Sequence, residues 1–226
     1  MARAGLKIVG IVDAHSALLR PEGLTGADVE SLLLSRSGNT LPPHPDVRKG
    51  PGAHEEFWST PAELFVAAAG SGSLDADRLD SLTAAGVKSI VAGANHPFWA
   101  SEPGDTSLEQ DADKRFAVIA DVIASCGTAH AFACQACSEF PLRPEAVFES
   151  IRESVERAVD EAARRSASAE HGPLAGALEF ALERCGRLPA HSIEVTDFIR
   201  NRPSTGSESR AMPGPSTCRS TGNVSR

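Results

Sequence analysis

Small or polar residues stand at, or just beyond, the ends of four apolar runs in this sequence. They are Asp13, Ala68, Ala69, Asn95, Asp121 and Gly127. In an open parallel sheet, ligands bind beyond the carboxyl ends of the strands, where such residues meet at one edge. A carboxylate there can accept hydrogen bonds from ribose hydroxyls, and small residues let a flat ligand approach the backbone. The pattern is typical of a nucleotide-binding edge.

Asp13 has two interpretations. At the end of a strand its carboxylate would bind a ribose, and its charge would disfavour a 2′-phosphate, which predicts NAD rather than NADP as the ligand. Aspartate is also a frequent turn residue, because its side chain hydrogen-bonds to nearby backbone amides. In the second interpretation Asp13 caps a turn and binds no ligand.

Cys134, Cys137 and His130 could form a metal or redox site, since thiolates and imidazole bind zinc. A second Cys-x-x-Cys pair is missing, however, and the three residues fall in an Ala-rich stretch that predicts a helix. Free cysteine is among the most buried residue types. We therefore predict buried thiols and no metal site, and we assign no catalytic residue.

The elements that must position these residues alternate between strands and helices. Near-continuous apolar runs predict strands at 6–12, 63–69, 87–92 and 116–120, whereas helices are predicted at 28–35, 74–85, 145–165 and 174–184. Dense Gly, Pro and Asn predict loops at 38–54 and 93–104. Strands that are apolar on both faces indicate a mostly parallel sheet covered by helices. The predicted fold class is α/β, doubly wound, with a helical C-terminal part.

One domain and one tail account for the chain. Residues 1–190 have the apolar patterning of a single domain, whereas 200–226 consist largely of Ser, Thr, Gly and Pro. A segment with so little apolar surface to bury does not offset the entropy of ordering. We predict that 200–226 is disordered.

Composition excludes several classes of protein. The 226 residues include 22 basic and 30 acidic side chains, a formal charge of −8, which disfavours nucleic acid as a partner. Apolar runs such as FVAAA at Phe65–Ala69 are far shorter than the ~20 residues that span a bilayer, so no membrane segment is expected. Five cysteines, an odd number without regular spacing, predict free thiols in the cytoplasm.

Four segments, in order, resemble the cofactor-binding domain of the glutamate/leucine/phenylalanine/valine dehydrogenase family, from about Leu6 to about Ala163. LKIVGIVDAHSALLRPEGL is similar to the strand that ends in the ribose-binding acid, and ELFVAAAGSGSLDADRLDSL to the strand with a Pro-Ala-Ala turn. VKSIVAGANHPF resembles the strand with the Gly-Ala-Asn-Gly-Pro turn. FAVIADVIASCGTAHAF resembles the strand, Pro-Asp turn and Asn-Ala-Gly-Gly helix start.

The resemblance implies an NAD-dependent oxidative deamination of an L-amino acid to a 2-oxo acid. Asp13 would bind the adenine ribose, and the Ala68–Ala69 backbone would lie along the dinucleotide. Asn95 would contact the nicotinamide ribose or the reacting amino acid, and Gly127 would start the helix beneath the nicotinamide.

The sequence departs from the family pattern at three positions. Ser125 replaces the family's Asn, Thr128 replaces its second glycine, and Phe132 stands where glutamate-specific members carry a substrate-contacting Ser. A phenylalanine at this position would suit an apolar substrate side chain, or no substrate at all.

Two parts of the family pattern are missing from this sequence. A Rossmann unit holds the pyrophosphate with its first strand and a Gly-x-Gly-x-x-Gly turn, and neither is present. The substrate domain with its catalytic lysines and aspartate is also absent, and Lys49 is the nearest imitation of such a lysine. We therefore expect an incomplete Rossmann-like domain whose missing strand is the central one, so that its neighbours have unpaired edges. Such a chain would be inactive alone and need a partner that supplies the substrate domain. The alternative is a non-catalytic remnant that serves as an interaction or regulatory module.

Overall fold

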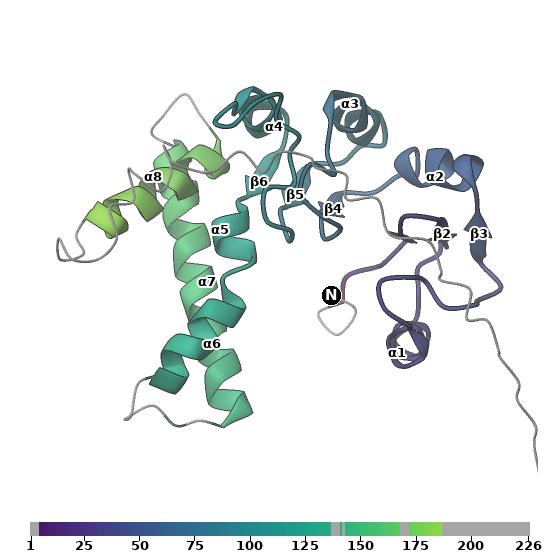
Figure 1. Ribbon diagram of the computed structural model, residues 1–226, viewed down its shortest axis with the longest axis horizontal. Coiled ribbons are helices and arrows are strands. Elements are labelled where there is room, and N and C mark those ends of the chain that lie inside the picture. The colour runs from purple at the N-terminus through teal and green to yellow at the C-terminus, as the bar shows by residue number, and fades with distance from the viewer. Residues whose placement is uncertain (1–4, 137–140, 142, 168–171, 187–226) are drawn as a thin grey trace, which may run out of the picture.

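The computed structural model describes residues 5–136, 141, 143–167 and 172–186, and its strands form two separate sheets (Figure 1). The first sheet is antiparallel, in the order β1-β2-β3, with strands Gly10–Val12, Ser16–Leu19 and Val47–Lys49. The second sheet is parallel, in the order β4-β5-β6, with strands Leu64–Val66, Ser89–Val91 and Ala117–Ile119.

From β2 to β6 the helices alternate with the strands, and four helices of the described residues follow β6. The first four are α1 (Gly26–Ser35), α2 (Pro51–Trp58), α3 (Ala76–Ala84) and α4 (Ser107–Arg115). The last four are α5 (Asp121–Ala124), α6 (Gly127–Ala136), α7 (Pro144–Ala167) and α8 (Pro173–Gly186). This order of strands and helices confirms the predicted α/β fold class and its helical C-terminal part.

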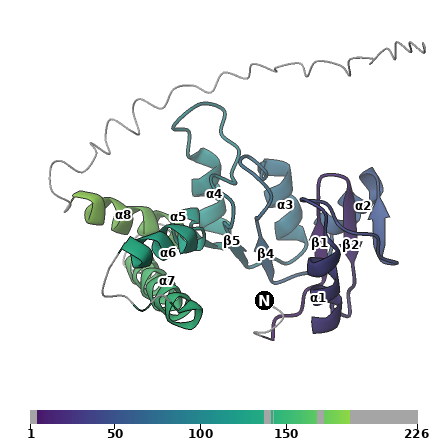
Figure 2. The ribbon, with the colours of Figure 1, turned by 60° about the horizontal axis from the view of Figure 1, so that its bottom comes forward.

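The antiparallel sheet lies between α1 and α2 (Figure 1, Figure 2). Ala17 and Leu19 pack with Ala53 of α2, whereas Leu18 between them packs with Leu32 of α1. Successive residues of a strand point to opposite faces, so the buried run of β2 supplies both small cores. The result is a layered unit in which a short sheet is covered on each face by one helix.

The predicted first strand, 6–12, is wrong in its length and in its pairing. Only Gly10–Val12 is a strand, and it pairs antiparallel with β2 instead of joining a parallel sheet. The reason is the tight turn at Asp13, which reverses the chain direction directly after β1.

The predicted loop 38–54 is also wrong, because it contains β3 and the start of α2. Pro51 begins that helix at a position where its missing N–H costs nothing.

The parallel sheet carries the main core. Its buried residues include Leu79 and Leu82 of α3, Ile90 of β5 and Val118 of β6. The strands and helices predicted in this region are present, although each strand is only three residues long. α4 was not predicted, because its sequence SLEQDADKR shows little apolar periodicity.

Helices α7 and α8 pack closely against each other, and α8 also packs against β6. A Cβ atom added at Gly176 would lie 2.7 Å from the carbonyl oxygen of Ala162, so only glycine lets the two helices approach this far. Buried Asp113 of α4 accepts hydrogen bonds from the amides of Leu174 and Ala175, at 2.9 and 3.1 Å. These amides are in the first turn of α8, where helical partners are lacking. Asp113 therefore fixes the start of α8.

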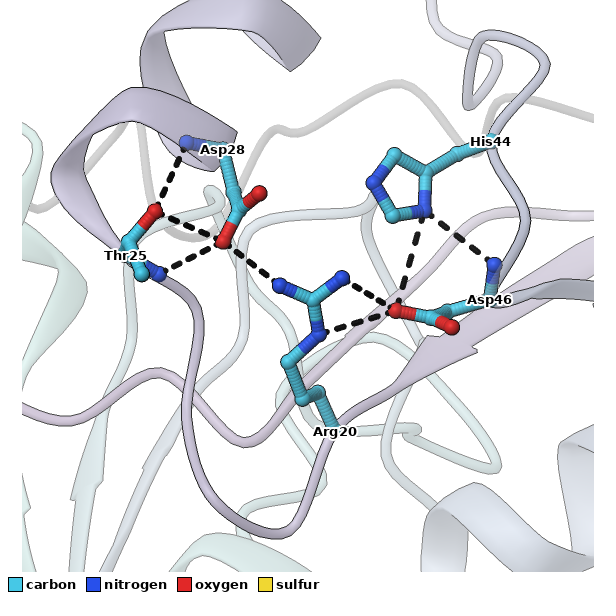
Figure 3. A network of polar contacts seen from close by, with 5 residues as sticks. All are labelled: Arg20, Thr25, Asp28, His44 and Asp46. Atoms are coloured by element: carbon cyan, nitrogen blue, oxygen red, sulfur yellow. Dashed lines mark hydrogen bonds and ion pairs between the residues drawn. The ribbon is translucent and has the colours of Figure 1, made fainter.

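A polar network ties the antiparallel sheet to the loop before β3 (Figure 3). The guanidinium of Arg20 donates to Asp28 at the start of α1 (2.5 Å) and to Asp46 (2.8 Å). Thr25 and Asp28 form a reciprocal capping box at the N-terminus of α1. Arg20 thus connects the end of β2 to both segments that follow it.

The two sheets are joined through α2. Phe57 packs on the core of the antiparallel sheet, and its neighbour Trp58 packs on the core of the parallel sheet. The two rings lie 5.4 Å apart, and Phe65 of β4 lies 5.4 Å from Trp58 and 6.3 Å from Phe57, centroid to centroid. Three aromatic rings therefore bridge the units where no strand does.

The predicted tail 200–226 lies outside the described residues, so its disorder and the domain boundary at 190 stay predictions. Within the described part of the chain, none of the helices has the length and apolarity needed to cross a membrane.

We expect Asp113→Ala to lower the free energy of unfolding by about 2 kcal/mol, because it removes the cap of α8 and leaves two buried amides without a hydrogen-bond acceptor. Asp113→Asn keeps one acceptor and should cost less. Urea unfolding followed by circular dichroism measures both. Asp160→Ala, an exposed position on α7, is the control and should stay within about 0.5 kcal/mol of the parent. Equal stability of Asp113→Ala and the control would contradict the capping role.

Candidate functional site

The segments that follow β4, β5 and β6 lie together at the carboxyl edge of the parallel sheet. The amide of Ala94, after β5, donates to the carbonyl of Ala67, after β4, at 2.7 Å. Further along, the amide of Leu74 donates to the carbonyl of Pro97 at 2.8 Å. Two loops that are distant in sequence are therefore bound to each other through their backbones.

Asn95 is held at this edge by one hydrogen bond to its backbone and one to its side chain. The hydroxyl of Ser71, after β4, donates to the carbonyl of Asn95 at 2.8 Å. The hydroxyl of Ser125, after α5, lies 3.2 Å from the side-chain oxygen of Asn95. Asn95 thus stands between the loops of the two outer strands, with its side chain open to solvent.

His96 and Asp121 lock the turn after β5 to the start of α5. The backbone amide of His96 donates to one carboxylate oxygen of Asp121, and the amide of Val122 donates to the other, both at 2.8 Å. His96 has φ +48°, and it alone among the described non-glycine residues has a positive φ. Such a backbone conformation is uncommon for an L-residue and persists where surrounding contacts enforce it. The bond to Asp121 is one such contact.

Glu109 of α4 is a titratable residue near this edge that the sequence did not single out. It is half-buried, and burial raises the pKa of its carboxyl, with a smaller upward contribution from the charge of Asp121. The imidazole of His96 acts in the opposite direction. No sequence pattern indicated a role for Glu109, because the helix that carries it, α4, was not predicted. A carboxyl with a raised pKa holds a proton closer to neutral pH, which is the property of a group that can exchange protons.

The small residues of the predicted site occupy two places. Ala68 and Ala69 are exposed after β4. Gly93 lies against Ala67 and Ala68, since a Cβ added there would lie 3.4 Å from the carbonyl oxygen of Ala67 and 3.7 Å from Cβ of Ala68. Gly127 starts α6 as predicted. The nearest atom to a Cβ added there is Cγ2 of Ile151, at an ordinary 3.8 Å, so the fold itself does not require glycine at 127.

Asp13 lies in the other sheet, in the turn between β1 and β2. One carboxylate oxygen accepts the amides of His15 (2.8 Å) and Ser16 (2.7 Å), and the second accepts the amide of Leu41 (2.5 Å). Burial raises the pKa of this carboxyl, but the hydrogen bonds from Leu41, His15 and Ser16 outweigh it and lower the pKa to about 2. Asp13 therefore caps this turn, as one of the two interpretations of the sequence predicted, and its ribose role stays a prediction.

The remaining sequence candidates that the structure describes lie in β3 and on α6. Lys49 is in β3. His130 forms a hydrogen bond of 2.8 Å with Ser150, Cys134 is buried as predicted, and Cys137 is outside the described residues. In the ranges that the structure describes, no three His, Cys, Asp or Glu side chains are placed to hold a metal ion. Phe132 is exposed on α6.

Comparison with known families matches residues 1–190 to one family, described as glutamate/leucine/phenylalanine/valine dehydrogenase. The chain belongs to this dehydrogenase family. The resemblance to this family, predicted from the sequence, is thereby confirmed. In that resemblance His96 takes the place of the glycine of the Gly-Ala-Asn-Gly-Pro turn, and its positive φ is consistent with this, because glycine adopts such values freely.

Solved structures of glutamate dehydrogenases share the fold. A glutamate dehydrogenase has a TM-score of 0.65 at 16% identity and covers 85% of this chain. A single-residue mutant of glutamate dehydrogenase gives 0.64 at 16% identity over 82% of this chain, and Plasmodium falciparum glutamate dehydrogenase 2 gives 0.58 at 17% identity over 82%. The match covers 42–44% of the length of these structures. No curated protein sequence matches significantly.

We predict that Asp13 contributes to stability in a pH-dependent way. Its pKa falls from an ordinary 3.8 to about 2 on folding, so the stabilisation is complete above about pH 4 and is lost as pH falls through about 2. At pH 7 Asp13→Ala should lower the free energy of unfolding by about 1–2 kcal/mol.

Unfolding in urea at a series of pH values between 2 and 7 measures this difference. The gap between the parent and Asp13→Ala should narrow below pH 4. Asp13→Asn keeps a hydrogen-bond acceptor for the turn but has no titrating group. It should therefore be more stable than Asp13→Ala, and its free energy of unfolding should not show the parent's loss of stability between pH 4 and pH 2. A gap that is constant with pH would show that the carboxylate charge does not matter.

Proposed function

We propose that this chain is the cofactor-binding part of an NAD-dependent amino-acid dehydrogenase, and that the edge around Asn95 receives the nicotinamide half of NAD. The observation that carries the proposal is the arrangement of Asn95, held between Ser71 and Ser125 where the loops of three parallel strands meet, in a member of a dehydrogenase family. NAD supplies the hydride acceptor when bound.

The residues of this edge suit one half of a dinucleotide. The exposed amide of Asn95 and the hydroxyl of Ser125 can hydrogen-bond to ribose hydroxyls, and the small residues Ala68, Ala69 and Gly93 leave the backbone accessible. Gly127 places the start of α6 beside this edge. The other half lacks its usual holder, since the sequence has no Gly-x-Gly-x-x-Gly turn to bind a pyrophosphate. Polypeptide outside these 226 residues would have to supply it.

Asp13 would select NAD over NADP in this proposal. One of its oxygens accepts a single described hydrogen bond, from Leu41, and so keeps a lone pair for a ribose hydroxyl. A 2′-phosphate near this carboxylate would be repelled by on the order of 1 kcal/mol after screening by solvent. That repulsion corresponds to a preference of about fivefold.

A second function is favoured by the missing glycine turn: a non-catalytic module that retains the sheet for interaction or regulation. The two functions differ in whether the chain binds a dinucleotide at all. Binding therefore decides between them before any activity is measured.

Titration of the full chain with NADH and NADPH, followed by nicotinamide fluorescence and calorimetry, tests the proposal. Asn95→Ala should weaken NADH binding about three- to tenfold, the value of one hydrogen bond. Asp13→Ser should narrow the preference for NADH over NADPH. Asn39→Ala, in an exposed loop of the other unit, is the matched control and should bind like the parent. An Asn95→Ala variant that binds NADH as the parent does would place the ligand elsewhere, and no binding by the parent would favour the non-catalytic module.

We also predict that the chain alone does not reduce NAD with glutamate, leucine, valine or phenylalanine. Holding an amino acid at reacting distance is worth ~7–11 kcal/mol, and the amine must be activated by a positioned base. Lys49, the nearest candidate in the sequence, lies in β3 of the other sheet. The measurement is the absorbance of reduced nicotinamide after NAD and each of the four amino acids are added to the chain. Turnover by the chain alone that Asn95→Ala abolishes would show a complete enzyme.

A further inference from the structure

A cavity of about 560 Å³ lies between α2 and α3, which are neighbours in the fold (Figure 1). It shares no lining residue with the edge around Asn95, so it is not part of the candidate functional site. Small-molecule sites are typically clefts of ~300–1,000 Å³ with apolar walls and a few polar groups. Each helix contributes one face to the wall, which includes His54, Glu55, Trp58, Asp77, Arg78 and Ala84.

Trp58 provides the largest apolar surface of this cavity. Its ring packs on the core of the parallel sheet and lies 5.4 Å from the ring of Phe65, centroid to centroid. Ala84 faces it from α3 with a methyl group only. The guanidinium of Arg78 lies 5.2 Å from the centroid of the Trp58 ring, a cation–π contact that holds this cation at the cavity. An apolar ligand group between the helices would therefore contact Trp58 and Ala84.

Two carboxylates in the wall have no partner. Among the described residues, the carboxylates of Glu55 and Asp77 neither accept a hydrogen bond nor form an ion pair. The next acid of α2 differs in this respect, because Glu56 pairs with Arg48 at 2.5 Å. One unpaired carboxylate on a protein surface is ordinary, but two that line the same cavity attract a positively charged group.

Two nitrogen donors line the same cavity. Nη1 of Arg78 donates to the carbonyl of Ser73, and its Nε lies 3.9 Å from a carboxylate oxygen of Asp75. Its Nη2 has no partner in the part of the chain that the structure describes. Nε2 of His54 is buried and also lacks a hydrogen-bond partner there. Nearly all buried polar groups in proteins are paired, so this nitrogen calls for a partner, which a turn of the ring toward the cavity would let a ligand supply.

Each helix places a nitrogen donor directly beside a carboxylate. On α2 these are His54 and Glu55, and on α3 they are Arg78 and Asp77. A purely anionic ligand bound to either donor would lie near a carboxylate of the same helix, and a purely cationic ligand bound to Asp77 would lie near Arg78. Like charges at such separations repel. A ligand with both charges on one carbon atom pairs with both kinds of group.

We infer that the cavity between α2 and α3 binds a free α-amino acid with an apolar side chain. The carboxylate of this ligand accepts hydrogen bonds from Arg78 and His54. Its ammonium group pairs with Glu55 and Asp77, and its side chain lies on Trp58. This is a different place from the edge at which an amino acid would meet a nicotinamide, and the inference does not depend on dinucleotide binding.

Leucine is the probe for the test, which is an NMR titration of the full chain observed at the indole N–H signals. The chain has two tryptophans, Trp58 in the cavity and Trp99 in the loop after β5. We expect leucine to shift the signal of Trp58 in a saturable way and to leave that of Trp99 in place. Trp99→Phe assigns the two signals.

Two analogues of leucine each lack one of its charges. 3-Methylbutylamine has no carboxylate, and 4-methylpentanoate has no ammonium group. Each should bind more weakly than leucine by about tenfold or more, because charge-assisted hydrogen bonds are lost and a like charge remains nearby. The absence of a Trp58 shift at millimolar leucine, or an analogue that binds as tightly as leucine, would overturn the inference.

Variants of the cavity check the placement of the ligand. Glu55→Gln and Asp77→Asn should each weaken leucine binding about three- to tenfold, since each removes one charge from the ammonium site. Glu30→Gln makes the same change at an exposed position of α1 and is the matched control, which should bind leucine like the parent.

Asn95→Ala separates this cavity from the sheet edge. It should leave the leucine-induced shift of Trp58 unchanged, whereas loss of that shift would place leucine at the edge and overturn the inference. If a cavity variant does not fold, the comparison of leucine with its two analogues on the unaltered chain decides the result. NADH titration of the same samples shows whether dinucleotide binding succeeds or fails independently.

Discussion

The contact of Phe57, Trp58 and Phe65 is the interaction on which the arrangement of this molecule depends. Phe57 and Trp58 are consecutive on α2, yet one packs on the core of the antiparallel sheet and the other on the core of the parallel sheet. Edge-to-face aromatic pairs add roughly 0.5–1.5 kcal/mol to the burial of their surfaces. Such a link can hold two units together, but it does not pair strands, so within the described residues β1 and β4 are outer strands of separate sheets.

The parallel sheet needs less support, and the candidate site belongs to it. Its three strands share one core with α3, α4, α7 and α8, and the loops at its carboxyl edge are bound to one another through Ala67, Ala94, Asn95 and Asp121. The site is thus built on the unit with the larger core. Asp13 is fixed just as firmly by its own turn, but in the other unit, so its position relative to Asn95 depends on the aromatic link.

Sequence patterns predicted the parts of this fold that local chemistry determines. Apolar runs located β4, β5 and β6, periodicity located α7, and the order of turns identified the family. The errors have a physical pattern. The run 6–12 looked like a buried parallel strand, because apolar composition does not encode the partner of a strand; the turn at Asp13 decided it. α4 was not predicted because its sequence is polar and shows no apolar face, and for the same reason Glu109 was not singled out. Asn95 and Asp121 could be placed at the edge in advance, but their hydrogen bonds could not, since these depend on how three loops fold together.

Two residues of the site are in states that reduce stability. His96 occupies a backbone conformation that glycine would adopt without strain, and Glu109 holds its carboxyl half-buried beside the carboxylate of Asp121. Strain and like-charge proximity both reduce stability, and residues that incur them persist where surrounding contacts over-determine them. Asp121 takes part in both features, because its carboxylate accepts the amide of His96 and its charge contributes to the raised pKa of Glu109. Asp121 therefore links the strained turn at His96 to the half-buried carboxyl of Glu109, at the same edge of the sheet as Asn95.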